Sequence, residues 1–527
     1  MMQSYLWLGD EALAQAAIDA GLSGVFAYPG TPSTEITEYI QKSKLAAERG
    51  IHSKWSCNEK TAMEEAIGMS FAGKRAMVCM KHVGLNVAAD AFINSAITGA
   101  NGGLVVASAD DPSMHSSQNE QDSRFYGQFA QIPYFEPSSQ QEAYDLTLQA
   151  FDVSERHGVP VLIRLTTRMA HSRANVIRRV ETPRDQNSLH LPADPRQFVL
   201  LPAIARRNYS RLLQKAPLFE QESEVSEFNQ YVEGPDRRMG ILACGIAINY
   251  IQEVYGEKGC PHSLLKIGRY PIPRKLVNRL VESCESVMVF EDGYPMVEEL
   301  VRGLTSKGPH VRGRLDGTLP RDGELSPTCV AKALGFPAPE TAKVPAEVVG
   351  RPPSMCRGCP HANTFEFIVE AVKSFPQARV FSDIGCYTLG ALPPYEAINS
   401  CVDMGASITM AKGASDAGLH PSLAVIGDST FAHSGLTGLL DVVSEKSPVT
   451  IVIGDNLITG MTGGQPSAAY QRLEQLVLGI GVEPQHLHVV VPLPVNHEVN
   501  VELLKKEMEY PGPSVIIARR ACVRAAV

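Results

Sequence analysis

Residues 422–455, SLAVIGDSTFAHSGLTGLLDVVSEKSPVTIVIGD, indicate the fold class of this chain. Two continuous apolar runs, 422–428 and 449–455, flank a segment with a helical pattern. Such runs, which end at Gly and Asp, are typical of parallel strands that helices cover on both faces. The stretch therefore predicts a strand–helix–strand unit of an α/β domain.

The same pattern recurs along the 527 residues, with apolar runs at 75–80, 103–108, 160–165, 239–244, 286–292, 378–385 and 513–520. The composition changes across 186–237 and across 336–353, and we interpret both segments as linkers. We therefore expect three doubly wound parallel-sheet domains, at 1–185, 238–335 and 354–527.

Charge and cysteine content narrow the function classes. The net charge of −9 disfavours binding to nucleic acid or to an anionic membrane. No apolar run approaches the roughly 18 residues of a membrane span, and no basic segment precedes the first apolar stretch, so we expect a cytoplasmic protein. Eleven cysteines, an odd number, favour thiol, metal or cluster chemistry over a disulfide framework.

Four of these cysteines fall within the last predicted domain. Cys356 and Cys359 form a CxxC pair that alone could be a redox pair, half of a zinc site, or neither. Cys386 and Cys522 follow predicted strands of the same domain. Because parallel strands end at one edge of a sheet, the four thiolates could meet there, as a [4Fe-4S] cluster requires.

A second motif lies in the quoted stretch and just beyond it. Gly427-Asp428-Ser429 is followed after 26 residues by Asn456, which resembles the diphosphate signature of thiamine diphosphate enzymes. Asp428, Asn456 and the Ile458 carbonyl would supply the oxygen ligands that Mg²⁺ needs. The continuation TGMTGGQP at 459–466, which includes Thr462 and Gly463, strengthens the match. The alternative is an ordinary Gly-Asp turn after a strand.

The segment NEKTA at 58–62 resembles the helix of a pyrimidine-binding domain. In that interpretation Glu59 hydrogen-bonds the aminopyrimidine ring and favours the imino tautomer of the cofactor. The alternative is a glutamate that the helix dipole favours at a helix start. Glu64 and Glu65 are competing carboxylates, but they lie inside the predicted helix.

Taken together, the chain resembles the 2-oxoacid:ferredoxin oxidoreductases, and most of all the indolepyruvate α-subunit branch. The segments that carry the resemblance include YPGTPSTEI at 28–36, MKHVGLNVAADAF at 80–92, DDPSMHSSQNEQDSR at 110–124, MCRGCPH at 355–361, SDIGCYTLG at 382–390 and GDSTFAHSG at 427–435.

The resemblance implies that the three domains are of the thiamine diphosphate enzyme type: a pyrimidine-binding domain at 1–185, a transketolase C-terminal-like domain at 238–335 and a diphosphate-binding domain at 354–527. It also implies oxidative decarboxylation of a 2-oxoacid, an aryl pyruvate such as indolepyruvate, to an acyl-CoA. The cofactors would be thiamine diphosphate, Mg²⁺ and a [4Fe-4S] cluster, with coenzyme A as cosubstrate. Thr31 and Arg124 would contact the substrate carboxylate, because a hydroxyl group and a cation suit that anion. His82 would take part in catalysis, and His361 and His433 would line the pocket.

The resemblance also implies partners: a smaller subunit, ferredoxin or another electron acceptor, and a dimer of heterodimers. The sequence departs from the family in two ways. Arg357 stands where a proline usually follows the first cluster cysteine, and no CxxCxxCxxxCP run follows Cys522. We therefore expect the electrons to leave through another polypeptide, or the enzyme to work without a ferredoxin-like domain.

Two other functions remain open from the sequence. A non-oxidative thiamine-dependent decarboxylase or lyase would use Glu59, Asp428 and Asn456 in the same way and would leave the cysteines idle. A catalytically silent subunit would keep the fold and a cluster for electron relay.

Overall fold

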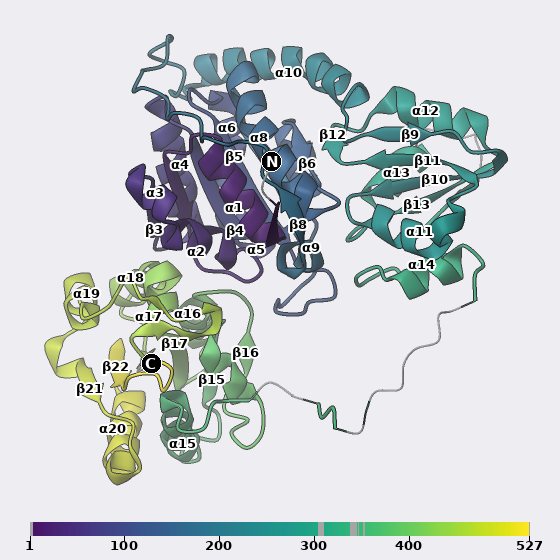
Figure 1. Ribbon diagram of the computed structural model, residues 1–527. Helices are drawn as coiled ribbons and strands as arrows, with labels where there is room; N and C mark the ends of the chain where they lie inside the picture. Colours follow the sequence, from purple (N-terminus) through teal and green to yellow (C-terminus); the bar gives the residue numbers. More distant parts are fainter. Residues whose placement is uncertain (1–3, 304–309, 338–344, 346, 351–353, 526–527) are drawn as a thin grey trace. The chain divides into compact units, whose positions relative to one another are not determined.

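A computed structural model describes residues 4–303, 310–337, 345, 347–350 and 354–525 (Figure 1). The chain divides into two compact units, Met1–Ala342 and Lys343–Val527. The predicted linker at 336–353 lies largely outside the described residues. The division into three domains with the boundaries given above stays a prediction.

The first unit contains a seven-stranded sheet of order β12-β6-β7-β5-β4-β2-β3. All of its pairs are parallel except the pair of β12 with β6. Its strands are β2 (Gly24–Ala27), β3 (His52–Trp55), β4 (Ala76–Lys81), β5 (Leu104–Asp110), β6 (Tyr134–Phe135), β7 (Val161–Thr166) and β12 (Arg269–Tyr270). The central strands are completely buried, which explains why they are apolar throughout.

Helices from several parts of the sequence surround this sheet (Figure 1). They are α1 (Gly9–Asp19), α2 (Thr34–Lys42), α3 (Lys44–Glu48), α4 (Glu59–Phe71), α5 (His82–Val87), α6 (Ala89–Thr98), α7 (Arg124–Ala130), α8 (Gln140–His157) and α9 (Thr167–His171). A separate antiparallel pair joins β1 (Ser4–Leu8) to β8 (Arg173–Ile177).

A second sheet of the same unit has the order β14-β13-β10-β11-β9. Its strands are β9 (Gln230–Val232), β10 (Asp236–Cys244), β11 (His262–Ile267), β13 (Ser286–Phe290) and β14 (His310–Arg312). Only β9 is antiparallel to its neighbour. Its helices are α11 (Ala247–Tyr255), α12 (Arg274–Ser283), α13 (Met296–Gly303) and α14 (Pro327–Ala333).

The predicted linker at 186–237 belongs to the first unit. It forms the long helix α10 (Pro202–Glu224), which contacts α6, α12 and β12 (Figure 1). Asn208, Leu212 and Phe219 are buried along one face of α10. Because charged residues separate these few buried positions, the apolar periodicity of the sequence is weak here.

The second unit is a six-stranded parallel sheet of order β16-β15-β17-β18-β22-β21. Its strands are β15 (Arg379–Ser382), β16 (Ser400–Cys401), β17 (Ser422–Gly427), β18 (Val449–Asp455), β21 (Leu487–Val490) and β22 (Ser514–Arg519). The longer helices are α15 (Pro360–Val372), α16 (Ala406–Asp416), α18 (Leu436–Ser444), α19 (Leu473–Ile480) and α20 (His497–Glu509).

The observed architecture confirms the predicted class of parallel α/β sheets. The quoted stretch folds as β17, α18 and β18, with β17 and β18 paired in parallel from Ser422 to Gly427. No helix among the described residues is long and apolar enough to cross a membrane.

Candidate active site

Asp428 follows β17 directly and is only 3% exposed. Its Oδ2 atom is buried and has no hydrogen-bond partner among the described residues. Burial and the nearby Asp455 raise the pKa of Asp428 to about 7, although a hydrogen bond with Ser467 opposes the shift. A buried carboxylate oxygen without a partner is costly unless it meets a cation or a proton, so this position suits a Mg²⁺ ligand.

Asn456 follows β18, the strand beside β17, and is also buried. Its Oδ1 accepts a hydrogen bond from the Ile458 amide at 3.1 Å, and its Nδ2 lies 3.1 Å from Nε2 of His361. Burial and Arg520 lower the pKa of His361 to about 4, so the ring is neutral at pH 7. Nε2 of His361 therefore accepts from Asn456, which orients the Asn456 amide and leaves its oxygen facing away from the ring.

A short hairpin follows Asn456, formed by β19 (Ile458–Thr459) and β20 (Gln465–Pro466). The Ser429 hydroxyl lies 2.9 Å from that of Thr459, which ties the hairpin to the residue after Asp428. Thr462 and Gln465 hydrogen-bond each other across the turn at 2.6 Å. Gly463 has φ +121°, a conformation that favours glycine. The predicted diphosphate residues thus form one connected loop system.

The four predicted cluster cysteines all lie in the second unit. Burial raises the pKa of Cys386 to about 11, and the electrostatic influence of Cys359, Cys522 and Cys356 adds to this increase. Cys356 is exposed, Cys359 is buried, and Cys386 and Cys522 are half-buried. The donor set therefore fits a thiolate-ligated iron–sulfur group at the edge of the unit.

Arg520 positions the CxxC loop, a role that the sequence motifs do not indicate. Its guanidinium donates to the Gly358 carbonyl at 2.9 Å, to Asn363 at 2.8 Å and to the Pro492 carbonyl at 2.7 Å. The Cys522 amide donates to the Asn456 carbonyl at 3.1 Å. The chain end after β22 therefore links the cysteine loop to the predicted Mg²⁺ ligands.

Glu59 is the first residue of α4 and is 5% exposed. The Asn58 side chain caps the helix by accepting from the Thr61 amide at 2.8 Å. Glu59 packs against Gly84 of α5, where a Cβ atom would lie 2.6 Å from Oε1 of Glu59. In contrast, Glu64 and Glu65 are exposed. The geometry thus separates Glu59 from its two competitors.

Lys81, which was not predicted as a site residue, lies beside the loop that contains Thr31. Nζ of Lys81 donates to the Ser116 carbonyl at 2.8 Å, and the Ser116 hydroxyl donates weakly to the Thr31 carbonyl at 3.4 Å. Burial lowers the pKa of Lys81 to about 8, against the opposing effect of Asp111. Lys81 ends β4 in the quoted family segment at 80–92, which is the signal that could have identified it.

The two remaining predicted histidines are buried. Nε2 of His82 lies 3.2 Å from the Asn119 carbonyl and must donate to it, while the buried Nδ1 has no partner among the described residues. His433 lies in the π-helical turn Phe431–Gly435 just after Asp428 and contacts Ser434. Single π turns are frequent at functional sites. A role for either ring stays a prediction.

Arg124 is not available to a substrate, contrary to the sequence prediction. It is 0% exposed, and its guanidinium forms ion pairs with Asp122 at 2.5 Å and with Glu291 at 2.9 Å. It also donates to the carbonyls of Asp292 and Tyr294, at 3.2 and 3.0 Å. Arg124 therefore joins the two sheets of the first unit, and its positive charge is already matched by buried carboxylates.

We expect Arg124→Met to destabilise the first unit by about 3–5 kcal/mol, because removal of one partner leaves buried carboxylates unpaired. Denaturant unfolding followed by circular dichroism measures this change. Arg179→Met is a matched control, because Arg179 forms an exposed ion pair with Asp145. Equal stability of the two variants would contradict the structural role of Arg124.

Two family matches cover most of the chain. Residues 15–201 match the family described as pyruvate flavodoxin/ferredoxin oxidoreductase, thiamine diphosphate-binding. Residues 383–517 match the family described as the C-terminal thiamine pyrophosphate-binding domain of thiamine pyrophosphate enzymes. Glu59 and Thr31 lie in the first match, and Asp428 and Asn456 lie in the second.

Curated relatives match over nearly the full chain. The indolepyruvate oxidoreductase subunit IorA of Archaeoglobus fulgidus is 39% identical over 98% of this chain and 86% of its own length. IorA of Pyrococcus abyssi is 38% identical over 98% of this chain and 85% of its own length. The 2-oxoglutarate synthase subunit KorA of Methanothermobacter thermautotrophicus is 30% identical, but over only 33% of this chain and 48% of its own length.

One solved structure shares the fold at low identity. It is the 2-oxoglutarate:ferredoxin oxidoreductase of Magnetococcus marinus, with a TM-score of 0.53 and 15% identity over 63% of this chain and 65% of that chain. Fold, family matches and relatives together define a thiamine diphosphate-dependent enzyme subunit that oxidatively decarboxylates 2-oxoacids. More narrowly, the chain belongs to the indolepyruvate oxidoreductase α-subunit family, whose members are named as subunits of larger complexes.

Proposed function

We propose that this subunit converts an aryl pyruvate such as indolepyruvate, together with coenzyme A, into an acyl-CoA and CO₂. One proton and two electrons are released per turnover, and the electrons pass singly through a [4Fe-4S] cluster to a partner or to ferredoxin. When bound, thiamine diphosphate supplies the electron sink that decarboxylation needs. The relatives named for indolepyruvate support the substrate class.

The presence of four cysteines in the second unit, at the positions that the family resemblance predicts, is the single observation that carries the oxidative assignment. A non-oxidative decarboxylase has no use for a cluster, whereas one-electron transfer needs a redox group near the cofactor. Cys356, Cys359, Cys386 and Cys522 come from three separate parts of the second unit. The loop after β18 contacts two of them: the Cys522 amide donates to the Asn456 carbonyl, and a Cβ atom at Gly460 would lie 3.4 Å from the sulfur of Cys386. Four thiolates are the ligand set of a [4Fe-4S] cluster.

The diphosphate end of thiamine diphosphate would be held by the second unit. Asp428 and Asn456 with the Ile458 carbonyl would bind Mg²⁺, which favours hard oxygen ligands. Backbone amides of Gly427 and Ser429, at the start of a helical turn, would approach the phosphates. The Thr462–Gly463 turn would border the same group.

We expect Asp428→Ala to abolish retention of thiamine diphosphate while the cluster and the fold remain. The substitution removes a charged Mg²⁺ ligand and leaves the diphosphate charge poorly neutralised. Thiamine content after gel filtration in Mg²⁺ buffer measures the effect. Asp441→Ala, at an exposed position on α18, is the control. Normal retention by Asp428→Ala would rule out the proposed Mg²⁺ ligand.

The first unit would bind the substrate carboxylate through Thr31 and Lys81, with Lys81 replacing the excluded Arg124. We expect Lys81→Met to raise KM for the 2-oxoacid about 10- to 100-fold, as for the loss of a hydrogen bond to a charged group. Lys60→Met, at an exposed residue of α4, is the control.

Assays would use indolepyruvate, 2-oxoglutarate and pyruvate with a viologen acceptor. The parent enzyme should give its highest kcat/KM with indolepyruvate. An unchanged KM in Lys81→Met would remove Lys81 from the site, and a preference for 2-oxoglutarate or pyruvate would overturn the substrate assignment.

The partners we propose are a smaller subunit and ferredoxin or a comparable one-electron acceptor, in a dimer of heterodimers. The subunit naming of the relatives supports a complex with other subunits. We propose coenzyme A as the acyl acceptor. The structure of the 2-oxoglutarate:ferredoxin oxidoreductase, which was solved with coenzyme A and succinyl-CoA bound, is consistent with this role.

A further inference from the structure

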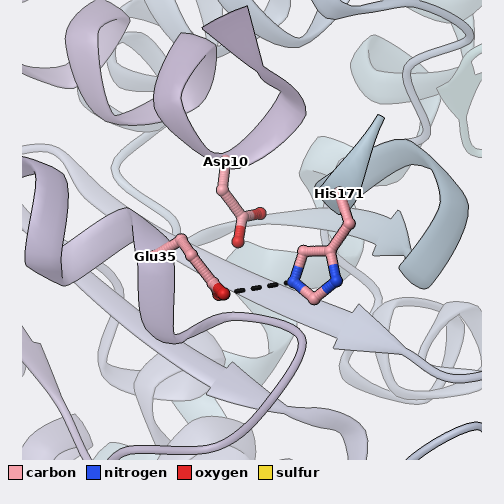
Figure 2. A group of neighbouring side chains, drawn as sticks. All are labelled: Asp10, Glu35 and His171. Carbon is pink, nitrogen blue, oxygen red and sulfur yellow. Dashed lines mark ion pairs between the residues drawn. The ribbon is translucent and has the colours of Figure 1, made fainter. Parts of the chain in front are cut away.

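Asp10, Glu35 and His171 form a compact group in the first unit, and none of them has a role assigned above (Figure 2). One ligand atom from each residue lies within 4.8 Å of those of the other two. The residues come from three helices: Asp10 from the first turn of α1, Glu35 from the first turn of α2, and His171 from the end of α9. In Figure 2 the three side chains point toward one another.

Asp10 is the buried member of this group. It is 0% exposed, and neither of its carboxylate oxygens has a hydrogen-bond partner among the described residues. Burial, together with Glu35 and Glu11, raises the pKa of Asp10 well above its usual range. A carboxylate in this position is costly unless a cation or a proton compensates it. The two unpartnered oxygens face Glu35 and His171 (Figure 2).

The packing of α1 against α9 fixes this arrangement. Gly9, which precedes Asp10, lies so close to α9 that a Cβ atom would be 2.2 Å from the Met169 carbonyl oxygen. Any larger residue would push the two helices apart and move Asp10 away from His171. The convergence of the three side chains therefore depends on a close backbone contact.

Glu35 and His171 leave the group open to solvent on one side. Nε2 of His171 lies 3.4 Å from Oε2 of Glu35. The side chain of His171 is 33% exposed, and that of Glu35 is 36% exposed. With both carboxylates ionised, the group carries a net negative charge even when the imidazole is protonated. Both oxygens of Asp10 and Oε2 of Glu35 are buried, so a cation would enter past the partly exposed side chains of Glu35 and His171.

We propose that Asp10, Glu35 and His171 bind one divalent transition-metal ion of the Zn²⁺ or Co²⁺ type. An imidazole with two carboxylates suits these ions, whereas Mg²⁺ and Ca²⁺ favour oxygen ligands alone. Water would complete the coordination on the exposed side. The ion would connect α1, α2 and α9, and α2 begins directly after the Thr31 loop.

Co²⁺ titration of the anaerobic holoenzyme, with its cluster and thiamine diphosphate in place and with excess Mg²⁺, tests this site. Co²⁺ is the probe because its visible spectrum reports its ligands. We expect one equivalent of Co²⁺ per chain, with ligand-field bands and without the thiolate charge-transfer band that binding to cysteine would give. Excess Mg²⁺ keeps Co²⁺ out of the proposed diphosphate site.

Three variants complete the test. Asp10→Asn keeps the shape and removes the buried charge, and we expect it to weaken Co²⁺ binding at least 100-fold. His171→Gln changes a partly exposed residue and should weaken binding at least tenfold. Glu38→Gln, one turn further along α2, should bind like the parent protein.

Two outcomes would overturn the proposal: a parent protein that binds no Co²⁺ at this stoichiometry, or His171→Gln that retains parental affinity. Thermal unfolding with and without Co²⁺ provides a second readout. The parent protein and Glu38→Gln should gain stability on binding, and His171→Gln should not. If Asp10→Asn fails to fold, the His171→Gln result alone decides the question.

Discussion

We expect Glu59→Gln to retain thiamine diphosphate. Its turnover rate should fall by about 10²- to 10⁴-fold, which is the usual effect of removing an acid–base group. The substitution keeps the size of the side chain and its buried position at the start of α4. It removes the carboxylate that would hold a proton on the aminopyrimidine ring. Thiamine content and the rate of 2-oxoacid-dependent viologen reduction measure binding and chemistry separately.

Two neighbours on the same helix are the controls for Glu59. Glu64 is paired with Lys60 at the surface, and the Glu65 carboxylate accepts a hydrogen bond from Ser56 at 2.6 Å. Glu64→Gln and Glu65→Gln should therefore remain close to parental activity. If either of them is severely impaired while Glu59→Gln is active, the wrong carboxylate has been selected.

Replacement of any one of Cys356, Cys359, Cys386 and Cys522 by Ser should have an equally large effect. A [4Fe-4S] cluster that lacks one thiolate becomes labile, so each variant should lose most of its iron and its 2-oxoacid-dependent viologen reduction. Thiamine diphosphate should stay bound, because Asp428 and Asn456 are unchanged. Iron and acid-labile sulfide per chain, measured after anaerobic purification, test this directly.

Cys401→Ser is the control for the cluster variants. Cys401 is exposed on the edge strand β16 of the same sheet, and its sulfur contacts the Asp383 carbonyl at 3.7 Å. It should keep parental iron content and activity. Four variants with full activity and no change in iron content would contradict the cluster assignment.

Secondary structure and the positions of strand ends could be predicted from the sequence, because they depend on residues that are close together in the chain. The apolar runs become buried parallel strands, and Glu59 begins a helix capped by Asn58. Asp428 and Asn456 follow adjacent strands, so the topology of a parallel sheet brings them to one edge. Cys386 and Cys522 likewise come after β15 and β22 of the same parallel sheet, whereas Cys356 and Cys359 precede α15.

Long-range pairing explains where the sequence analysis fails. Within its own segment, Arg124 resembles a substrate-binding cation. Its partner Glu291 lies 167 residues further along the chain, so no local sequence pattern predicts this ion pair. Lys81 ends a buried strand and resembles an ordinary strand residue until the fold places it beside the Thr31 loop. The group of Asp10, Glu35 and His171 likewise has no local motif.

The most direct test of the whole account is reduction of the cluster by substrate in the anaerobic holoenzyme with its partner subunit and no external acceptor. We expect a 2-oxoacid and coenzyme A to bleach the visible absorption of a cluster with about four irons per chain. The bleaching should require bound thiamine diphosphate and should disappear in Glu59→Gln. Thiamine-dependent CO₂ release from protein that contains no iron, or whose absorption stays unchanged, would contradict the oxidative mechanism and would favour the non-oxidative decarboxylase.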